Sequence, residues 1–278
     1  MIWNIVIALA LSLLPALSWL LFYYKKDYRE PEPKGVIFKT FVAGMTVAVP
    51  FLGLKLLMAK IPNLNAALVG ISAVMVFAAL EEMAKLTASI FVVTRNKMHF
   101  NQVIDGVVYA VTAALGFAFV ENLFYFIQFF KYEQQGLWSL FLFRSLGTML
   151  AHTLFSGLAG LIWAYAYFSK QITPFQEKGL LAFRFKDFIN TEILSLHIIR
   201  KNILSATPSR RGGHEKKILV LEGMVAATLL HAIFNLTTTY QVLGLGLTFL
   251  LVPIIMGGLI YVSFVFTKKL NNQILKVV

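Results

Sequence analysis

Polar side chains recur inside the most apolar stretches of this 278-residue chain. They are Glu81, Glu82, Lys85, Glu121, Asn122, Arg144, His152, Ser156, His231 and Asn235. Several are spaced by three or four residues, which places them on one face of a helix. Groups of these types can exchange protons with a substrate, hold a cation or relay protons. The residue types alone therefore allow an enzyme, a metal site or an ion pathway.

The composition indicates the solvent around these groups. Hydrophobic residues make up 58% of the chain and charged residues 14%, against averages of about 45–50% and 25% in soluble proteins. The chain has no cysteine, which excludes thiolate metal ligands and a cysteine nucleophile. We infer a polytopic membrane protein. A charged group at mid-bilayer costs about 2.5–3.5 kcal/mol there, so these charges are not accidental.

Seven apolar runs are long enough to cross a hydrocarbon core of about 30 Å. They cover residues 1–23, 36–59, 66–93, 105–130, 140–168, 218–240 and 244–266. The first has no basic segment before it and is followed by Lys25 and Lys26, so we expect an uncleaved anchor. The predicted fold class is an all-α membrane helix bundle with about seven transmembrane helices, and residues 1–278 form a single membrane domain.

Lysines and arginines fall almost entirely on one side of this scheme. Of 25 basic residues, 19 lie in loops on one side, two on the other side and four inside spans. The positive-inside rule then places the N-terminus outside and the C-terminus in the cytoplasm. The basic loop 169–217 is cytoplasmic on this topology, and it either lies on anionic lipid or is a solvated linker. Orientation thus accounts for most of the net charge of +12, and we expect no nucleic-acid partner.

This topology brings the polar groups of spans three to six to a similar depth. With a rise of 1.5 Å per residue, Glu81, Glu82, Glu121, His152 and His231 differ in depth by at most about 10 Å. Lys85 and Arg144 can each offset one carboxylate, which leaves one negative charge if both histidines are neutral. A shared proton, a protonated imidazole or a bound cation could compensate it. We expect Lys39 and Lys55, near span ends, to extend to the membrane surface instead.

Four short motifs follow one another on these spans. They are Glu81-Glu82-Met83-Ala84-Lys85, Phe117 to Glu121 followed by Asn122, His152-Thr153-Leu154-Phe155-Ser156, and His231-Ala232-Ile233-Phe234-Asn235. With these motifs in this order, residues 36–266 resemble the PrsW family of intramembrane proteases. That family is distantly similar to the CAAX prenyl endopeptidases, in which a histidine stands at the place of Glu121.

The resemblance implies a glutamate-dependent endopeptidase of a bacterial cell membrane. Its substrates would be single-span, membrane-anchored proteins such as anti-sigma factors. Carried over by motif, Glu81 or Glu82 would activate water together with His152, and His231 and Asn235 would lie beside the oxyanion. Glu121 is a further catalytic candidate, and the supporting residues are Lys85, Asn122, Arg144 and Ser156.

Three alternatives stay open at this level. The same groups could hold Zn²⁺ through Glu81, Glu121, His152 and His231, although no HExxH motif is present and a mechanism without a cofactor is slightly favoured. Buried glutamates and histidines also serve proton- or ion-coupled transporters, but no inverted repeat is evident. Finally, the polar groups could join helices in a membrane assembly protein.

Overall fold

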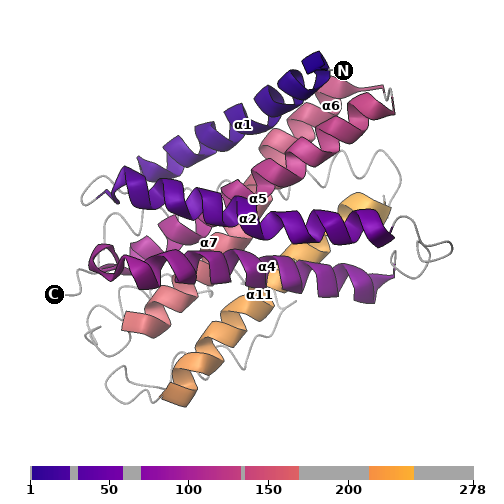
Figure 1. The fold of residues 1–278 in the computed structure, drawn as a ribbon. Coiled ribbons are helices and arrows are strands. Elements are labelled where there is room, and N and C mark those ends of the chain that lie inside the picture. The colour runs from indigo at the N-terminus through magenta and orange to yellow at the C-terminus, as the bar shows by residue number, and fades with distance from the viewer. Residues whose placement is uncertain (1, 26–30, 59–69, 133–134, 169–212, 241–278) are drawn as a thin grey trace.

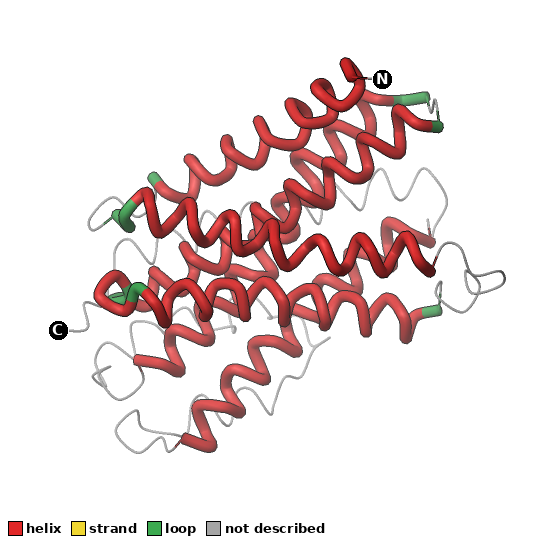
Figure 2. The backbone as a smooth tube through the Cα atoms, viewed as in Figure 1, coloured by secondary structure: helices red, strands yellow, loops and turns green. Residues whose placement is uncertain are grey.

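The computed structural model describes residues 2–25, 31–58, 70–132, 135–168 and 213–240. These residues form helices, most of them 20 residues or longer, and within these ranges no β-strand (Figure 1, Figure 2). The seventh predicted span, 244–266, and residues 169–212 of the predicted basic loop lie outside the described residues. The contact of that loop with anionic lipid therefore stays a prediction.

The helices follow the predicted spans closely. They are α1 (Ile2–Tyr24), α2 (Lys34–Met58), α4 (Ile71–Arg95), α5 (Val103–Lys131), α6 (Leu137–Leu142), the π-helix η2 (Phe143–Thr148), α7 (Met149–Phe168) and α11 (Gly213–Tyr240), with a short 3₁₀ turn η1 (Lys97–His99). Each boundary lies within five residues of the six predicted spans that fall in the described ranges. The all-helical class is therefore confirmed, whereas the number of seven spans and the orientation stay predictions.

Among the described residues, five helical segments are long and apolar enough to cross a membrane. They are α1, α2, α5, the continuous segment Leu137–Phe168 and α11. Helix α4 has the same 25-residue length as α2, but it carries Glu81, Glu82 and Lys85. The chain is a multi-pass membrane protein, and α4, the helix with the most buried charged residues, runs alongside these apolar helices.

Helix α5 is the centre of the bundle. It packs against α1, α2, α4 and α7, while α11 packs against α4 and α7 (Figure 1). Small residues allow the backbones to come close, as is common between membrane helices. A Cβ atom at Gly44 of α2 would overlap the backbone of Ala113, and one at Gly106 of α5 would overlap Gly160 of α7. These contacts fix α2 and α7 on α5.

A π-helical segment interrupts the predicted span 140–168. Six residues, Phe143–Thr148, adopt the wider turn, and two of its backbone carbonyls accept hydrogen bonds from side chains of other helices. Trp19 Nε1 donates to the Ser145 carbonyl at 2.9 Å, and Asn122 Nδ2 donates to the Arg144 carbonyl at 3.3 Å. Both donors come from other helices. The irregular turn therefore involves tertiary contacts, which the hydrophobic periodicity of this segment cannot predict.

The close approach of α2 to α5 can be tested with two glycines of α2. We expect Gly44→Ala to destabilise the protein by about 1–3 kcal/mol, because the added methyl group meets the Ala113 backbone. Gly53→Ala is the matched control, since no atom lies within 4 Å of a Cβ there and alanine favours a helix. Thermal unfolding in detergent measures both variants. Equal stability of the two would contradict the described packing.

Candidate active site

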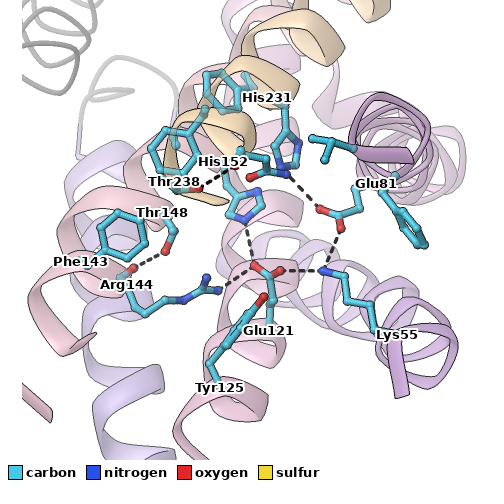
Figure 3. Close-up of a pocket in the computed structure, with 16 residues that line it drawn as sticks. Lys55, Glu81, Glu121, Tyr125, Phe143, Arg144, Thr148, His152, His231 and Thr238 are labelled. Atoms are coloured by element: carbon cyan, nitrogen blue, oxygen red, sulfur yellow. Dashed lines mark hydrogen bonds and ion pairs between the residues drawn. The ribbon is translucent and has the colours of Figure 1, made fainter. Parts of the chain in front are cut away.

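A cavity of about 220 Å³ lies between α2, α4, α5, α11 and the segment formed by η2 and α7 (Figure 3). Its polar lining consists of Lys55, Glu81, Glu121, Arg144, Thr148, His152, His231, Asn235 and Thr238. Aromatic side chains, among them Phe77, Phe155 and Phe234, complete the wall. A water molecule occupies about 30 Å³ in the liquid, so the space accommodates several waters or a few atoms of a peptide.

Glu121 of α5 is the most connected carboxylate in Figure 3. Its Oε2 accepts from Arg144 Nη2 at 2.8 Å and lies 3.2 Å from His152 Nε2, and its Oε1 accepts from Lys55 Nζ at 3.0 Å. Arg144 is fixed in turn, since its Nε donates to Asn122 Oδ1 at 2.6 Å and its guanidinium lies over the Tyr125 ring. Glu121 therefore joins α2, α5 and α7 through paired charges.

Glu82 lies behind the cavity wall and is completely enclosed. Its Oε1 accepts from Lys85 Nζ at 2.7 Å and from His231 Nδ1 at 2.8 Å, and its Oε2 accepts from Ser156 Oγ at 2.7 Å. Both oxygens are thus occupied by protein donors. Glu82 links α4, α7 and α11 and holds the ring of His231 in one orientation.

Glu81 differs from its neighbour because it lines the cavity. Its Oε1 lies 3.2 Å from Lys55 Nζ, and its Oε2 lies 3.6 Å from His231 Nε2. Neither contact is as short as those of Glu82. The two adjacent glutamates therefore face different surroundings, as their offset of about 100° around the helix requires. Glu81 is the one that a substrate or water in the cavity can reach.

The hydrogen-bond partners indicate the proton positions on the two histidines. His231 Nδ1 lies 2.8 Å from the Glu82 carboxylate and so carries hydrogen, and in the neutral ring its Nε2, 3.6 Å from Glu81 Oε2, carries none. His152 Nδ1 lies 2.7 Å from Lys85 Nζ and so accepts, which places the hydrogen on Nε2 toward Glu121. The two rings are 5.1 Å apart and nearly perpendicular. Each histidine is oriented by one charged residue behind it.

The expectation that Lys55 extends to the membrane surface is wrong. Its ammonium bridges Glu81 and Glu121, and only 29% of its side chain is exposed. Three carboxylates thus face three cations, Lys55, Lys85 and Arg144, so the predicted excess negative charge is absent. The sequence contained a signal for this pairing, because Lys85 and Arg144 left one of the three carboxylates inside the spans without a positive partner. The attraction between buried opposite charges outweighs the access to the membrane surface.

The other predicted residues divide into two groups. His152, His231 and Asn235 line the cavity with Glu81 and Glu121. The second group, Glu82, Lys85, Asn122 and Ser156, lies behind them and contacts them. Asn235 is partly exposed and comes from the same helix as His231. All ten predicted residues are therefore in or directly behind one site, while their chemical roles stay predictions.

Three side chains could converge on a metal ion. Donor atoms of Glu81, His152 and His231 lie within 4.8 Å of one another. Glu121, the fourth ligand suggested by the sequence, is not part of this group. Two imidazoles and one carboxylate with an open side are a common ligand set for catalytic zinc, and the carboxylate behind His231 is the usual partner of a ligating histidine. The donor set therefore fits such an ion in type and number.

Comparison with known proteins shows which family the chain is similar to. A family model described as PrsW family intramembrane metalloprotease matches residues 32–184. Protease PrsW of Oceanobacillus iheyensis is 31% identical over 176 residues, covering 63% of this chain and 75% of the relative. Protease PrsW of Geobacillus kaustophilus is 29% identical over 56% of this chain and 64% of its own length, and that of Bacillus subtilis is 28% identical over 41% and 50%. No solved structure matches the chain.

The family model matches more than half of the chain, and it includes the helices that carry Glu81, Glu121 and His152. This agrees with the resemblance of the four motifs and favours an enzyme over a transporter or an assembly protein. The chain belongs to the PrsW family of intramembrane proteases and is a membrane-embedded peptidase.

Proposed function

We propose that this protease hydrolyses peptide bonds of single-span, membrane-anchored proteins of the anti-sigma-factor class, in the cell membrane of a bacterium. The match to a family of intramembrane proteases supports the location in a membrane, and the bacterial relatives named protease PrsW support the bacterial origin. The observation that carries the proposal is the position of Glu81. Glu81 lines the cavity together with two oriented histidines and has longer contacts than Glu121, which also lines it, while Glu82 is engaged behind the wall.

Glu81 is the proposed base. Peptide hydrolysis needs a group that takes a proton from water and returns it to the leaving amine, and a desolvated glutamate can do both. Glu81 suits this role because its contacts, one to Lys55 and a longer one to His231, leave it open to the cavity. Glu82 is the proposed positioning residue, since it does not line the cavity and acts on it through His231 and, by way of Lys85, through His152.

Donors for the developing oxyanion come from two sides of the cavity. The amide of Asn235 and the ammonium of Lys55 both line it, and both can donate hydrogen bonds. His231 was expected beside the oxyanion as well. With its hydrogen on Nδ1, its Nε2 cannot donate, so we assign the donor role to Asn235 and Lys55.

As the alternative to this metal-free mechanism, we propose that Glu81, His152 and His231 hold one zinc ion, in which case Glu81 would be a ligand and not the base. A bound zinc ion lowers the pKa of a coordinated water and polarises a carbonyl group. To make room, the Lys55 ammonium would leave the cavity, and the Lys85–His152 pair would lose one proton. Zinc would bring two positive charges and these two changes would remove two, so the net charge of the site would stay the same. Lys55 is suited to this because its side chain is partly exposed, whereas Lys85 is completely buried.

The different roles of the adjacent glutamates can be tested by substitution. We expect Glu81→Gln to lower kcat for a single-span substrate by about 10²–10⁴-fold, because the base is lost. Ser156→Ala removes one hydrogen bond from Glu82 without removing a charge, and we expect a loss of less than about 10-fold, the worth of one hydrogen bond. Purified variants in liposomes, with thermal unfolding as a control for folding, give both values. Full activity of Glu81→Gln would refute its assignment as the base.

Metal content provides an independent test. The zinc-bound alternative predicts about one zinc ion per purified chain and loss of cleavage after chelation, restored by zinc. Because Lys55 competes for Glu81, we expect Lys55→Met to bind zinc roughly ten-fold more tightly, as removal of a nearby like charge should. Lys39→Met, on the same helix but outside the cavity, is the matched control. Full cleavage by protein shown to be free of metal would instead support the glutamate mechanism without a cofactor.

A further inference from the structure

A second hollow lies on the outer face of the bundle, in a groove between α2 and α4. It measures about 490 Å³ and is more open than the catalytic cavity. Lys39 belongs to this groove, and Lys55 lies 16 residues further along the same helix, about 24 Å away at 1.5 Å per residue. The groove is therefore separate from the catalytic site.

The groove has one charged end. Lys39 of α2 and Arg95, the last residue of α4, line it together with the amide of Asn96, and none of its nine lining residues is acidic. Arg95 is held in place, since its Nη1 donates to the Phe91 carbonyl at 3.3 Å and its guanidinium lies 3.5 Å from the centre of the Phe91 ring. Its other N–H groups remain available for an anion.

The rest of the groove is apolar. Phe38 and Val42 of α2 and Phe91 of α4 are all exposed at its surface. Lys39 lies about 8 Å from the start of α2, which is the depth at which lysine side chains reach the lipid headgroups. Val42 and Thr46 continue along α2 toward the middle of the membrane. The groove is thus cationic at the membrane surface and apolar below it.

We propose that this groove binds one anionic phospholipid. The phosphate group would lie between Lys39 and Arg95, and an acyl chain would run along α2 past Val42. Charge complementarity favours an anionic lipid over a zwitterionic one, and the apolar floor favours a lipid over a free phosphate ion. Because α2 and α4 supply Lys55 and Glu81, a lipid in this groove would join the two helices that meet again at the catalytic cavity.

Binding of fluorescent phosphatidylglycerol to the purified full chain in neutral detergent micelles tests the proposal. Unlabelled phosphatidylglycerol should compete, phosphatidylcholine should compete at least about ten-fold more weakly, and inorganic phosphate should not compete. The double variant Lys39→Gln/Arg95→Gln should bind about thirty-fold more weakly, since each cation near an anionic lipid contributes about a factor of five.

The matched control is Lys34→Gln/Lys97→Gln. It removes the same charge from exposed residues at the same end of the bundle, outside the groove, and should change binding less than about three-fold. Equal weakening in the two double variants would show a diffuse attraction to surface charge and would overturn the site. Competition by phosphatidylcholine as strong as by phosphatidylglycerol, or competition by inorganic phosphate, would overturn the choice of ligand.

Discussion

Three carboxylates lie close together inside a bundle of apolar helices, and each is paired with a cation. Lys55 contacts Glu81 and Glu121, Lys85 contacts Glu82, and Arg144 contacts Glu121. Without these partners the charges would be too costly to bury in a membrane protein. The pairs made by Lys55 and Arg144 cross helix boundaries, so the same contacts that make these charges tolerable also hold α2, α4, α5 and η2 together around the cavity.

The three glutamates differ in their hydrogen bonds, and this difference separates their proposed roles. Glu82 and Glu121 are saturated by donors on both oxygens, and they orient His231 and His152. Glu81 keeps the longest contacts of the three and lines the cavity. In the proposed mechanism this set of paired charges surrounds the one carboxylate that acts as the base. Such preorganisation is the usual source of electrostatic catalysis in enzymes.

Hydropathy and spacing predicted much of this arrangement. The boundaries of the described helices were predicted to within five residues, because membrane helices must be long and apolar. All ten candidate residues lie in or behind one site, because charges inside a membrane bundle must converge on one another. Lys55 was misplaced, since its position near a span end also suits a lysine at the membrane surface. The π-helix and the separate roles of Glu81 and Glu82 were not predictable either, because both depend on side chains from other helices, such as Trp19, Asn122 and Ser156.

The central claim is that water attacks a peptide bond at the cavity within the bundle. The most direct measurement is mass spectrometry of the products formed by the purified chain in liposomes, from a single-span reporter protein in ¹⁸O-labelled water. The proposed function predicts one cut inside the membrane segment of the reporter, with ¹⁸O in the new terminal carboxyl group. An intact reporter, or cuts only outside the membrane segment, would contradict it.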